Sequence, residues 1–177
     1  FILAYLTWLA EPDQPVGQER WYVPPGSLMP QTRDGFPEGY FNCGLAHGIP
    51  GPLAAMALAW KAGYRYPGLH EAIQYLSTWL LEHQVKEPWG MGWPDAVPLQ
   101  ASYTAKDWRA LNGTRTAWCY GTPGVARSLW LAGQALEDDN LCQEAVTAIE
   151  SVLRRPVELR QINSPTLCHG VAGLLQI

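Results

Sequence analysis

The sequence predicts an all-α protein built from paired helices, and three observations support this fold class. Apolar residues recur with helical spacing in five segments, which are residues 1–10, 51–62, 69–86, 123–136 and 138–154. No segment shows the sustained apolar–polar alternation that indicates a half-buried strand. One glycine pattern also recurs at the entry to three helical segments, which indicates an internal repeat.

The helices form two pairs. Residues 51–62 and 69–86 make the first pair, separated by the helix-breaking run GYRYPG, and residues 123–136 and 138–154 make the second. Each helix carries its apolar positions on one face, as in the series Leu53, Met56, Ala57 and Trp60. The chain begins without methionine in an apolar run and ends in another. We therefore expect it to be part of a longer protein.

Composition excludes several classes of protein. Charged residues make up 16% of the 177 residues, and the formal net charge is −4, so no basic stripe is available to bind nucleic acid. No apolar run reaches the roughly 18 residues of a membrane span. Four cysteines at this length do not indicate a disulfide scaffold, and we expect a reducing, cytoplasmic environment with one or two functional thiols.

The repeated glycine pattern predicts where reactive residues gather. Its three copies are HGIPG (47–51), YGTPG (120–124) and HGVAG (169–173). Repeated helical hairpins bury their faces by stacking on one another, which places every entry turn at the same end of the stack. The residues just before the turns should then meet on one rim. They are His47, Cys119, Tyr120, Cys168 and His169.

Cys119, Cys168 and His169 form a Cys₂His set that suits a catalytic zinc ion with one open position. Two thiolates and a neutral imidazole leave such a centre formally neutral. A substrate thiol, whose free pKa is about 8.5, would be stabilised there as a thiolate and stay nucleophilic. This chemistry fits sulfur alkylation or conjugate addition. The simpler alternative is a pair of buried structural thiols beside a capped turn.

Other residues near the turns are weaker candidates. His47 has the right chemistry to transfer a proton near the metal. Arg115 precedes Cys119 by four residues and would stabilise developing negative charge, although a surface ion pair is the simpler role. Trp118 and the Trp89–Trp93 loop are candidates either to line a substrate groove or to plug the core. We expect Cys43 to be a small buried thiol, and His70 and His83 to face solvent.

The segments GLAHGIPG (44–51), RTAWCYGTPG (115–124) and LCHGVAG (167–173) resemble the signature turns of the lanthionine synthetase C-like family, the lanthipeptide cyclases. The WCYG form is more similar to the stand-alone cyclases of class I pathways. The resemblance implies an α/α toroid of seven helical hairpins with zinc near the centre of one end. Residues 1–177 would be part of one such domain and would leave the toroid incomplete.

The resemblance also implies a reaction and its residues. Family members add peptide cysteine thiols to dehydroalanine or dehydrobutyrine, which forms lanthionine and methyllanthionine rings. By motif, Cys119, Cys168 and His169 would bind Zn²⁺, while His47 and Arg115 would be catalytic and Trp118 would contact substrate. The family also uses an aspartate from an earlier hairpin, to which we assign no residue here.

The implied partners are a dehydrated precursor peptide and the dehydratase and transporter of the same pathway, at the inner face of the membrane. Three alternatives stay open at this point. One is another thiol-activating toroid such as a prenyltransferase β subunit, whose Asp-Cys-His ligands differ from the set here. The second is a protein that binds thiols or glutathione without cyclising anything. The third is a purely structural zinc site.

Overall fold

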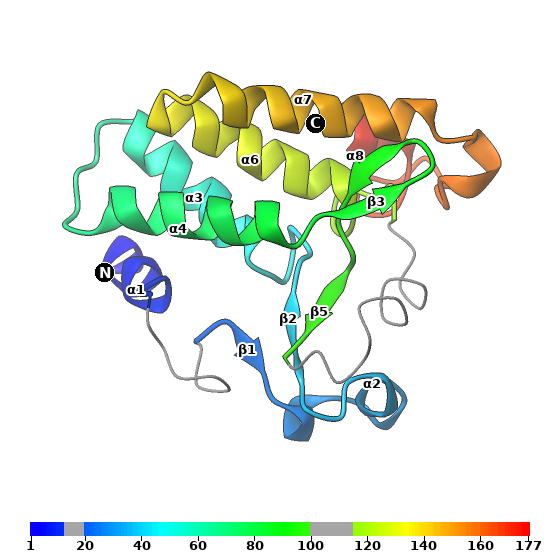
Figure 1. Cartoon of the computed structure of the whole chain (residues 1–177), viewed down its shortest axis with the longest axis horizontal. Helices are drawn as coiled ribbons and strands as arrows, with labels where there is room; N and C mark the ends of the chain where they lie inside the picture. Colours follow the sequence, from blue (N-terminus) through cyan, green and yellow to red (C-terminus); the bar gives the residue numbers. More distant parts are fainter. Residues whose placement is uncertain (13–19, 100–114) are drawn as a thin grey trace.

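The computed structural model describes residues 1–12, 20–99 and 115–177 (Figure 1). Its longer helices are α1 (Ile2–Leu9), α3 (Pro50–Lys61), α4 (Leu69–Glu82), α6 (Thr122–Leu136) and α7 (Asp139–Arg154). Short helical turns are η1 (Pro25–Ser27), α2 (Pro30–Gly35), η2 (Val157–Leu159) and α8 (Val171–Leu175). All five predicted helices are therefore present. The largest difference is that α4 ends at Glu82 rather than at residue 86.

Helix α6 is the centre of the helical layer and packs against α3, α4 and α7 (Figure 1). Its residues Val125, Leu129 and Ala132 are fully buried, as their apolar spacing predicts. A two-residue link reverses the chain into α7. Glu137 adopts a left-handed conformation there, and the Asp138 side chain accepts a 3.0 Å hydrogen bond from the N–H of Leu141. Such an N-cap contributes about 1 kcal/mol to helix stability.

Five short strands, which the sequence analysis did not predict, accompany the helices in the described part of the chain. Strands β1 (Tyr22–Val23), β2 (Tyr40–Asn42) and β5 (Ala96–Pro98) form an antiparallel sheet in that order. Strands β3 (Val85–Glu87) and β4 (Gly90–Gly92) form a hairpin beside α7. Segments of two or three residues are too short to show alternation, so the sequence carried no strand signal.

The three-stranded sheet helps to position the rim of turns. Phe41 pairs with Val97, and Asn42 pairs with Ala96. Strand β2 runs directly into the first glycine turn, and β5 begins directly after Asp95. The sheet therefore holds an acidic residue next to the first turn.

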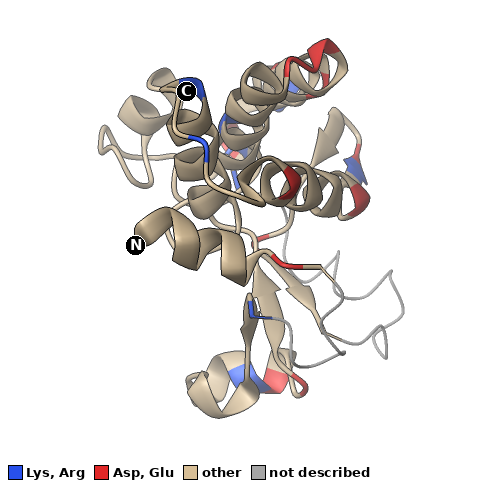
Figure 2. Cartoon of the chain, turned by 90° about the vertical axis from the view of Figure 1, so that its left-hand side faces the viewer, with Lys and Arg blue, Asp and Glu red and all other residues tan. Residues whose placement is uncertain are grey.

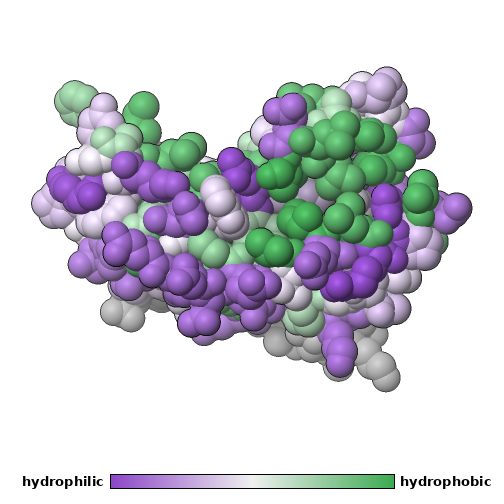
Figure 3. All heavy atoms as spheres, turned by 90° about the horizontal axis from the view of Figure 1, so that it is seen from above, coloured by the Kyte–Doolittle hydropathy of each residue, from purple (hydrophilic) through white to green (hydrophobic). Residues whose placement is uncertain are grey.

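The surface combines scattered charge with exposed apolar area. Charged residues lie at several helix ends and outer faces rather than in one stripe (Figure 2). Figure 3 views the molecule from the side of α7 and shows hydrophobic surface gathered over part of that side. Several large apolar side chains near the end of the chain are exposed, namely Leu153, Val157, Leu159, Leu167 and Leu175. None of the described helices is long and apolar enough to cross a bilayer.

Candidate metal centre

The three glycine turns have the same backbone geometry. In each, the residue after the first glycine donates its N–H to the carbonyl oxygen seven residues earlier. The three bonds are Ile49 to Asn42 at 3.0 Å, Thr122 to Arg115 at 3.3 Å and Val171 to Ser164 at 3.0 Å. The repeat in the sequence is therefore a repeat in structure.

Close backbone approach explains why glycine occupies these turns. A Cβ on the first glycine of each turn would lie 2.0–2.2 Å from the carbonyl oxygen six residues earlier. These glycines are Gly48, Gly121 and Gly170. Gly121 also has φ +100°, a conformation that side chains strongly disfavour. No other residue fits these positions without moving the backbone.

Backbone hydrogen bonds join the three turns side by side. The N–H of Ala46 donates to the carbonyl of Cys119 at 3.3 Å, and the N–H of Cys119 donates to the carbonyl of Cys168 at 3.4 Å. Ala46, Cys119 and Cys168 thus occupy equivalent positions in consecutive turns. The first turn has alanine where the second and third have cysteine. The expected convergence on one rim is therefore present.

Cys119, Cys168 and His169 lie together as the sequence analysis expected. Their sulfur and ring-nitrogen atoms are all within 4.8 Å of one another. The Cys168 Sγ and His169 Nε2 atoms are 3.9 Å apart. Tetrahedral zinc bound by sulfur and nitrogen separates its ligand atoms by roughly 3.4–3.8 Å. The donor set and its spacing therefore fit a zinc ion after a small adjustment.

Burial is graded across this group, with Cys119 buried, Cys168 partly exposed and His169 exposed. Burial, followed by the neighbouring Cys168, raises the pKa of the Cys119 thiol to about 11. A cation is the usual means of holding such a thiol as a thiolate at neutral pH, because a bound metal deprotonates its thiol ligand. The exposed side of the group faces solvent through His169, which leaves an approach for a substrate.

His47 and Tyr120 face each other beside this group, with ring centroids 5.8 Å apart. His47 is exposed and lines a groove of about 420 Å³ with Trp21, Val23 and Asn42. The Asn42 Nδ2 atom donates a 3.1 Å hydrogen bond to the Tyr120 hydroxyl. Burial raises the pKa of that hydroxyl. The structure thus places a histidine in the lining of a groove and a phenol beside that histidine.

Tyr120 is a site residue that the sequence analysis placed on the rim without giving it a role. The signal was available in the repeat, because Tyr120 occupies the position of His47 in the first turn and His169 in the third. All three have ring side chains that can exchange protons. The position that Tyr120 shares with His47 and His169 in the repeat therefore indicated a site residue more strongly than its being a tyrosine did.

Arg115 forms an ion pair with Asp95, with 3.3 Å between Nε and Oδ2. The simpler role expected for Arg115, an ion pair, is therefore present, although its partner comes from the edge of the sheet and not from the outer surface. Burial raises the pKa of the Asp95 carboxyl, and the positive charge of Arg115 partly offsets this. Asp95 is the second residue that the sequence analysis missed.

Trp89 and Trp93 pack within the fold, and Trp118 lies close to a neighbouring turn. Trp118 approaches the third turn closely. A Cβ added to Gly173 would lie only 2.8 Å from the Cβ of Trp118. Trp93 is fully buried and donates from Nε1 to the Leu80 carbonyl at 2.7 Å. Trp89 donates to Glu87 and lies under the Arg155 guanidinium. Of the two roles considered for the Trp89–Trp93 loop, the structure supports packing.

Two further expectations concern residues away from the rim. Cys43 is fully buried, as predicted. The prediction that His70 and His83 face solvent was wrong, because both rings pack on tryptophans and are half-buried. His70 lies 5.1 Å from Trp60, and His83 stacks on Trp79 at 4.0 Å between centroids. Trp79 covers His83 from one turn earlier in the chain, whereas Trp60 covers His70 from the neighbouring helix α3.

Comparisons with known proteins agree on one family. The family model described as "Lanthionine synthetase C-like protein" matches residues 28–177. Nisin biosynthesis protein NisC of Lactococcus lactis subsp. lactis is 29% identical over 157 residues, which cover 88% of this chain and 37% of that protein. The solved structure of nisin cyclase matches with a TM-score of 0.78 and 26% identity, over 98% of this chain and 42% of that one.

These matches establish the fold class and show how much of its relatives' length the chain spans. Nisin cyclase is an α/α toroid, so the structural match confirms the predicted fold class, with this chain as an incomplete toroid. The chain spans less than half the length of both relatives.

Proposed function

Because the chain belongs to the lanthionine synthetase C-like family, we propose that it is part of a zinc-dependent lanthipeptide cyclase. The observation that carries the proposal is the meeting of Cys119, Cys168 and His169, whose donor atoms lie within 4.8 Å of one another. We assign these three residues as the zinc ligands. Bound zinc would lower the pKa of a peptide thiol so that it reacts as a thiolate at neutral pH.

The proposed reaction is an isomerisation that creates one thioether. The substrate cysteine loses its S–H proton, and its sulfur forms a bond to Cβ of dehydroalanine or dehydrobutyrine. The electron pair of the C=C bond moves toward Cα, which then takes up a proton. No atoms enter or leave. The protein must therefore accept one proton, return one, and stabilise negative charge in between.

We assign these steps to His47 and Arg115. His47 is exposed at the groove and would accept the thiol proton or return a proton to Cα. The Arg115 guanidinium would stabilise the negative charge on the carbonyl oxygen conjugated to Cα. Trp118, which is next to Cys119 and partly exposed, would contact the peptide. These roles combine proton transfer, charge stabilisation and orientation at one rim.

The surroundings of the reaction follow from the same proposal. Residues 1–177 would form part of a single cyclase-like toroid domain. The substrate would be a dehydrated precursor peptide, supplied by a dehydratase and exported by a transporter at the inner membrane face. We propose a cytoplasmic location, which the four free cysteines of the chain support because thiols stay reduced there.

The test is cyclisation by the full-length protein. A dehydrated precursor peptide is incubated with the protein, and free thiols are then counted by alkylation and mass spectrometry. Cyclisation removes thiols without changing the peptide mass. We expect wild type to contain one zinc per chain and to cyclise, and Cys119→Ala and His169→Ala to lose both properties while keeping helical circular dichroism. Zinc-free wild type, or binding of glutathione without thioether formation, would overturn the proposal.

A further inference from the structure

Asp95 is the point at which the sheet meets two of the glycine turns. Its backbone carbonyl accepts a 2.9 Å hydrogen bond from the N–H of Cys43, at the start of the first turn. Its side chain reaches the second turn, where Oδ2 lies 3.3 Å from Nε of Arg115. One residue therefore links the turn that carries His47 to the turn that carries Cys119.

The environment of the pair is asymmetric. The Asp95 side chain is 25% exposed, while that of Arg115 is 47% exposed. Oδ1 of Asp95 is buried and has no hydrogen-bond partner among residues 1–12, 20–99 and 115–177. A largely buried carboxylate costs free energy unless a cation compensates it. Asp95 is thus the anchored member of the pair, and Arg115 is the member that extends toward solvent.

The geometry of a guanidinium makes such an anchor useful. An arginine side chain has several rotatable bonds, and fixing it in one arrangement costs conformational entropy. A contact through Nε fixes the plane of the guanidinium near its root. A group that stabilises developing charge contributes most when its orientation is set before the reaction begins.

We propose that Asp95 is a positioning residue, which holds the Arg115 guanidinium in the orientation that stabilises negative charge on the substrate. This inference rests on the proposed cyclase function. Asp95 acts through Arg115 and does not itself touch the reacting atoms. The competing role is purely structural, in which Asp95 only ties β5 to the first turn.

A double-mutant cycle in the full-length protein separates these roles. The variants are Asp95→Asn, Arg115→Ala and the double variant, with Asp95→Glu as the conservative control. We expect Asp95→Asn to lower kcat by about 10- to 100-fold with KM nearly unchanged, and Asp95→Glu to recover part of the loss. The double variant should be no slower than Arg115→Ala alone, because the function of Asp95 requires Arg115. Losses that multiply in the double variant would overturn the inference.

A second measurement does not depend on activity. The ¹⁵Nε–H resonance of Arg115 is assigned through its absence in Arg115→Ala, and it is compared between wild type and Asp95→Asn. We expect a shifted, protected signal in wild type that moves toward the position of free arginine in Asp95→Asn. An unchanged signal would overturn the inference. If wild type fails to cyclise any dehydrated peptide, the proposed function fails, while this measurement still decides whether Asp95 orients Arg115.

Discussion

The backbone N–H of Cys119 donates a hydrogen bond to the carbonyl oxygen of Cys168 at 3.4 Å, so a direct backbone contact joins the turns that carry the metal ligands. A metal that organises the fold leaves an unfolded chain when it is removed. Here the turns are joined independently of any ion. We therefore expect removal of zinc by a chelator to change the helical circular dichroism by less than about a tenth.

That outcome would distinguish a catalytic metal from a structural one. The measurement is far-ultraviolet circular dichroism before and after chelation, with metal content determined on the same samples. Restoring zinc should restore activity without a refolding step. Loss of most helical signal on chelation would instead identify a structural zinc site.

Gly121 is expected to be the most sensitive glycine of the second turn. A Cβ there would lie 2.0 Å from the Arg115 carbonyl oxygen, and φ is +100°. Gly121→Ala combines a clash with an unfavourable conformation, and we expect it to lower the free energy of unfolding by about 3 kcal/mol or more. It should also reduce zinc content, because the clash displaces the turn that holds Cys119.

Gly26→Ala is the matched control, since a Cβ at Gly26 meets nothing within 4 Å. Urea denaturation of both variants gives the comparison. The control should differ from wild type by less than about 1 kcal/mol. Equal stability of the two variants would show that a small movement of the backbone accommodates the added Cβ at Gly121.

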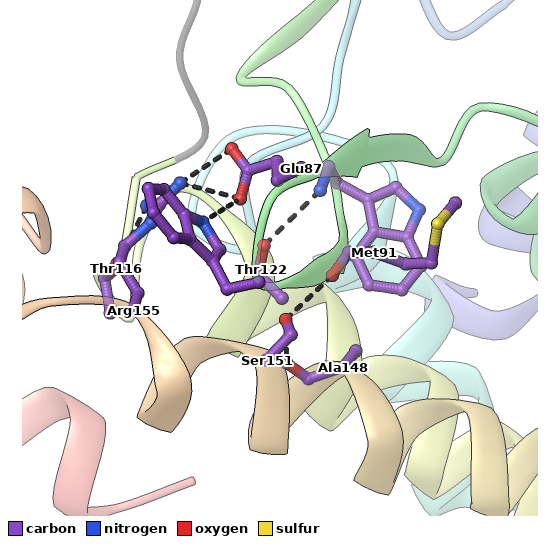
Figure 4. A network of polar contacts seen from close by, with 9 residues as sticks. Glu87, Met91, Thr116, Thr122, Ala148, Ser151 and Arg155 are labelled. Carbon is purple, nitrogen blue, oxygen red and sulfur yellow. Dashed lines mark hydrogen bonds and ion pairs between the residues drawn. The ribbon is translucent and has the colours of Figure 1, made fainter.

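Arg155 contacts the segment that leads into the second turn, through the network in Figure 4. Its side chain is 7% exposed and binds both carboxylate oxygens of Glu87, at 2.6 and 2.7 Å. It also donates to the Thr116 hydroxyl at 3.1 Å, next to Arg115. Removing one partner of a buried pair leaves the other uncompensated. We expect Arg155→Ala to cost about 3 kcal/mol of unfolding free energy.

Arg154 provides the control from the adjacent position. Its side chain is 54% exposed and pairs with Glu150 at 3.4 Å. Exposed pairs contribute little, so Arg154→Ala should cost less than about 1 kcal/mol. Thermal unfolding of both variants measures the difference. Similar losses in the two variants would show that burial does not strengthen the Arg155 contacts.

The sequence was informative where a pattern repeats. Helical spacing predicted the five helices, and the glycine pattern predicted which turns meet, because both depend on many residues. Tyr120 could have been assigned from its place in the repeat, whereas the contact of Asp95 with Arg115 joins segments that no repeat relates. Nothing in the run WPDAV indicates that Asp95 pairs with Arg115, because the pairing requires the register of β5 against β2. His70 was misjudged for a similar reason, since a neighbouring helix supplies the Trp60 ring that covers it.

The separation of His47 from the metal group gives the last prediction. His47 is not a member of the Cys119, Cys168 and His169 group, and it lies beside Tyr120 at the groove. If it transfers a proton, His47→Asn should lower kcat for cyclisation by at least about 100-fold. Zinc content should stay at one per chain, because the three ligands are intact.

His83→Asn is the control, because His83 stacks on Trp79 on α4 and lies outside the proposed catalytic machinery. It should keep kcat within about twofold of wild type, while losing about 1 kcal/mol of stability with the contact between Nδ1 and the Trp79 carbonyl. Thiol counting with the dehydrated peptide and metal analysis are run on both variants. Simultaneous loss of zinc and activity in His47→Asn would make His47 a metal ligand, and unchanged activity would remove it from the mechanism. Loss of activity with zinc retained assigns the proton transfer to His47, because the metal centre and the fold are then unchanged.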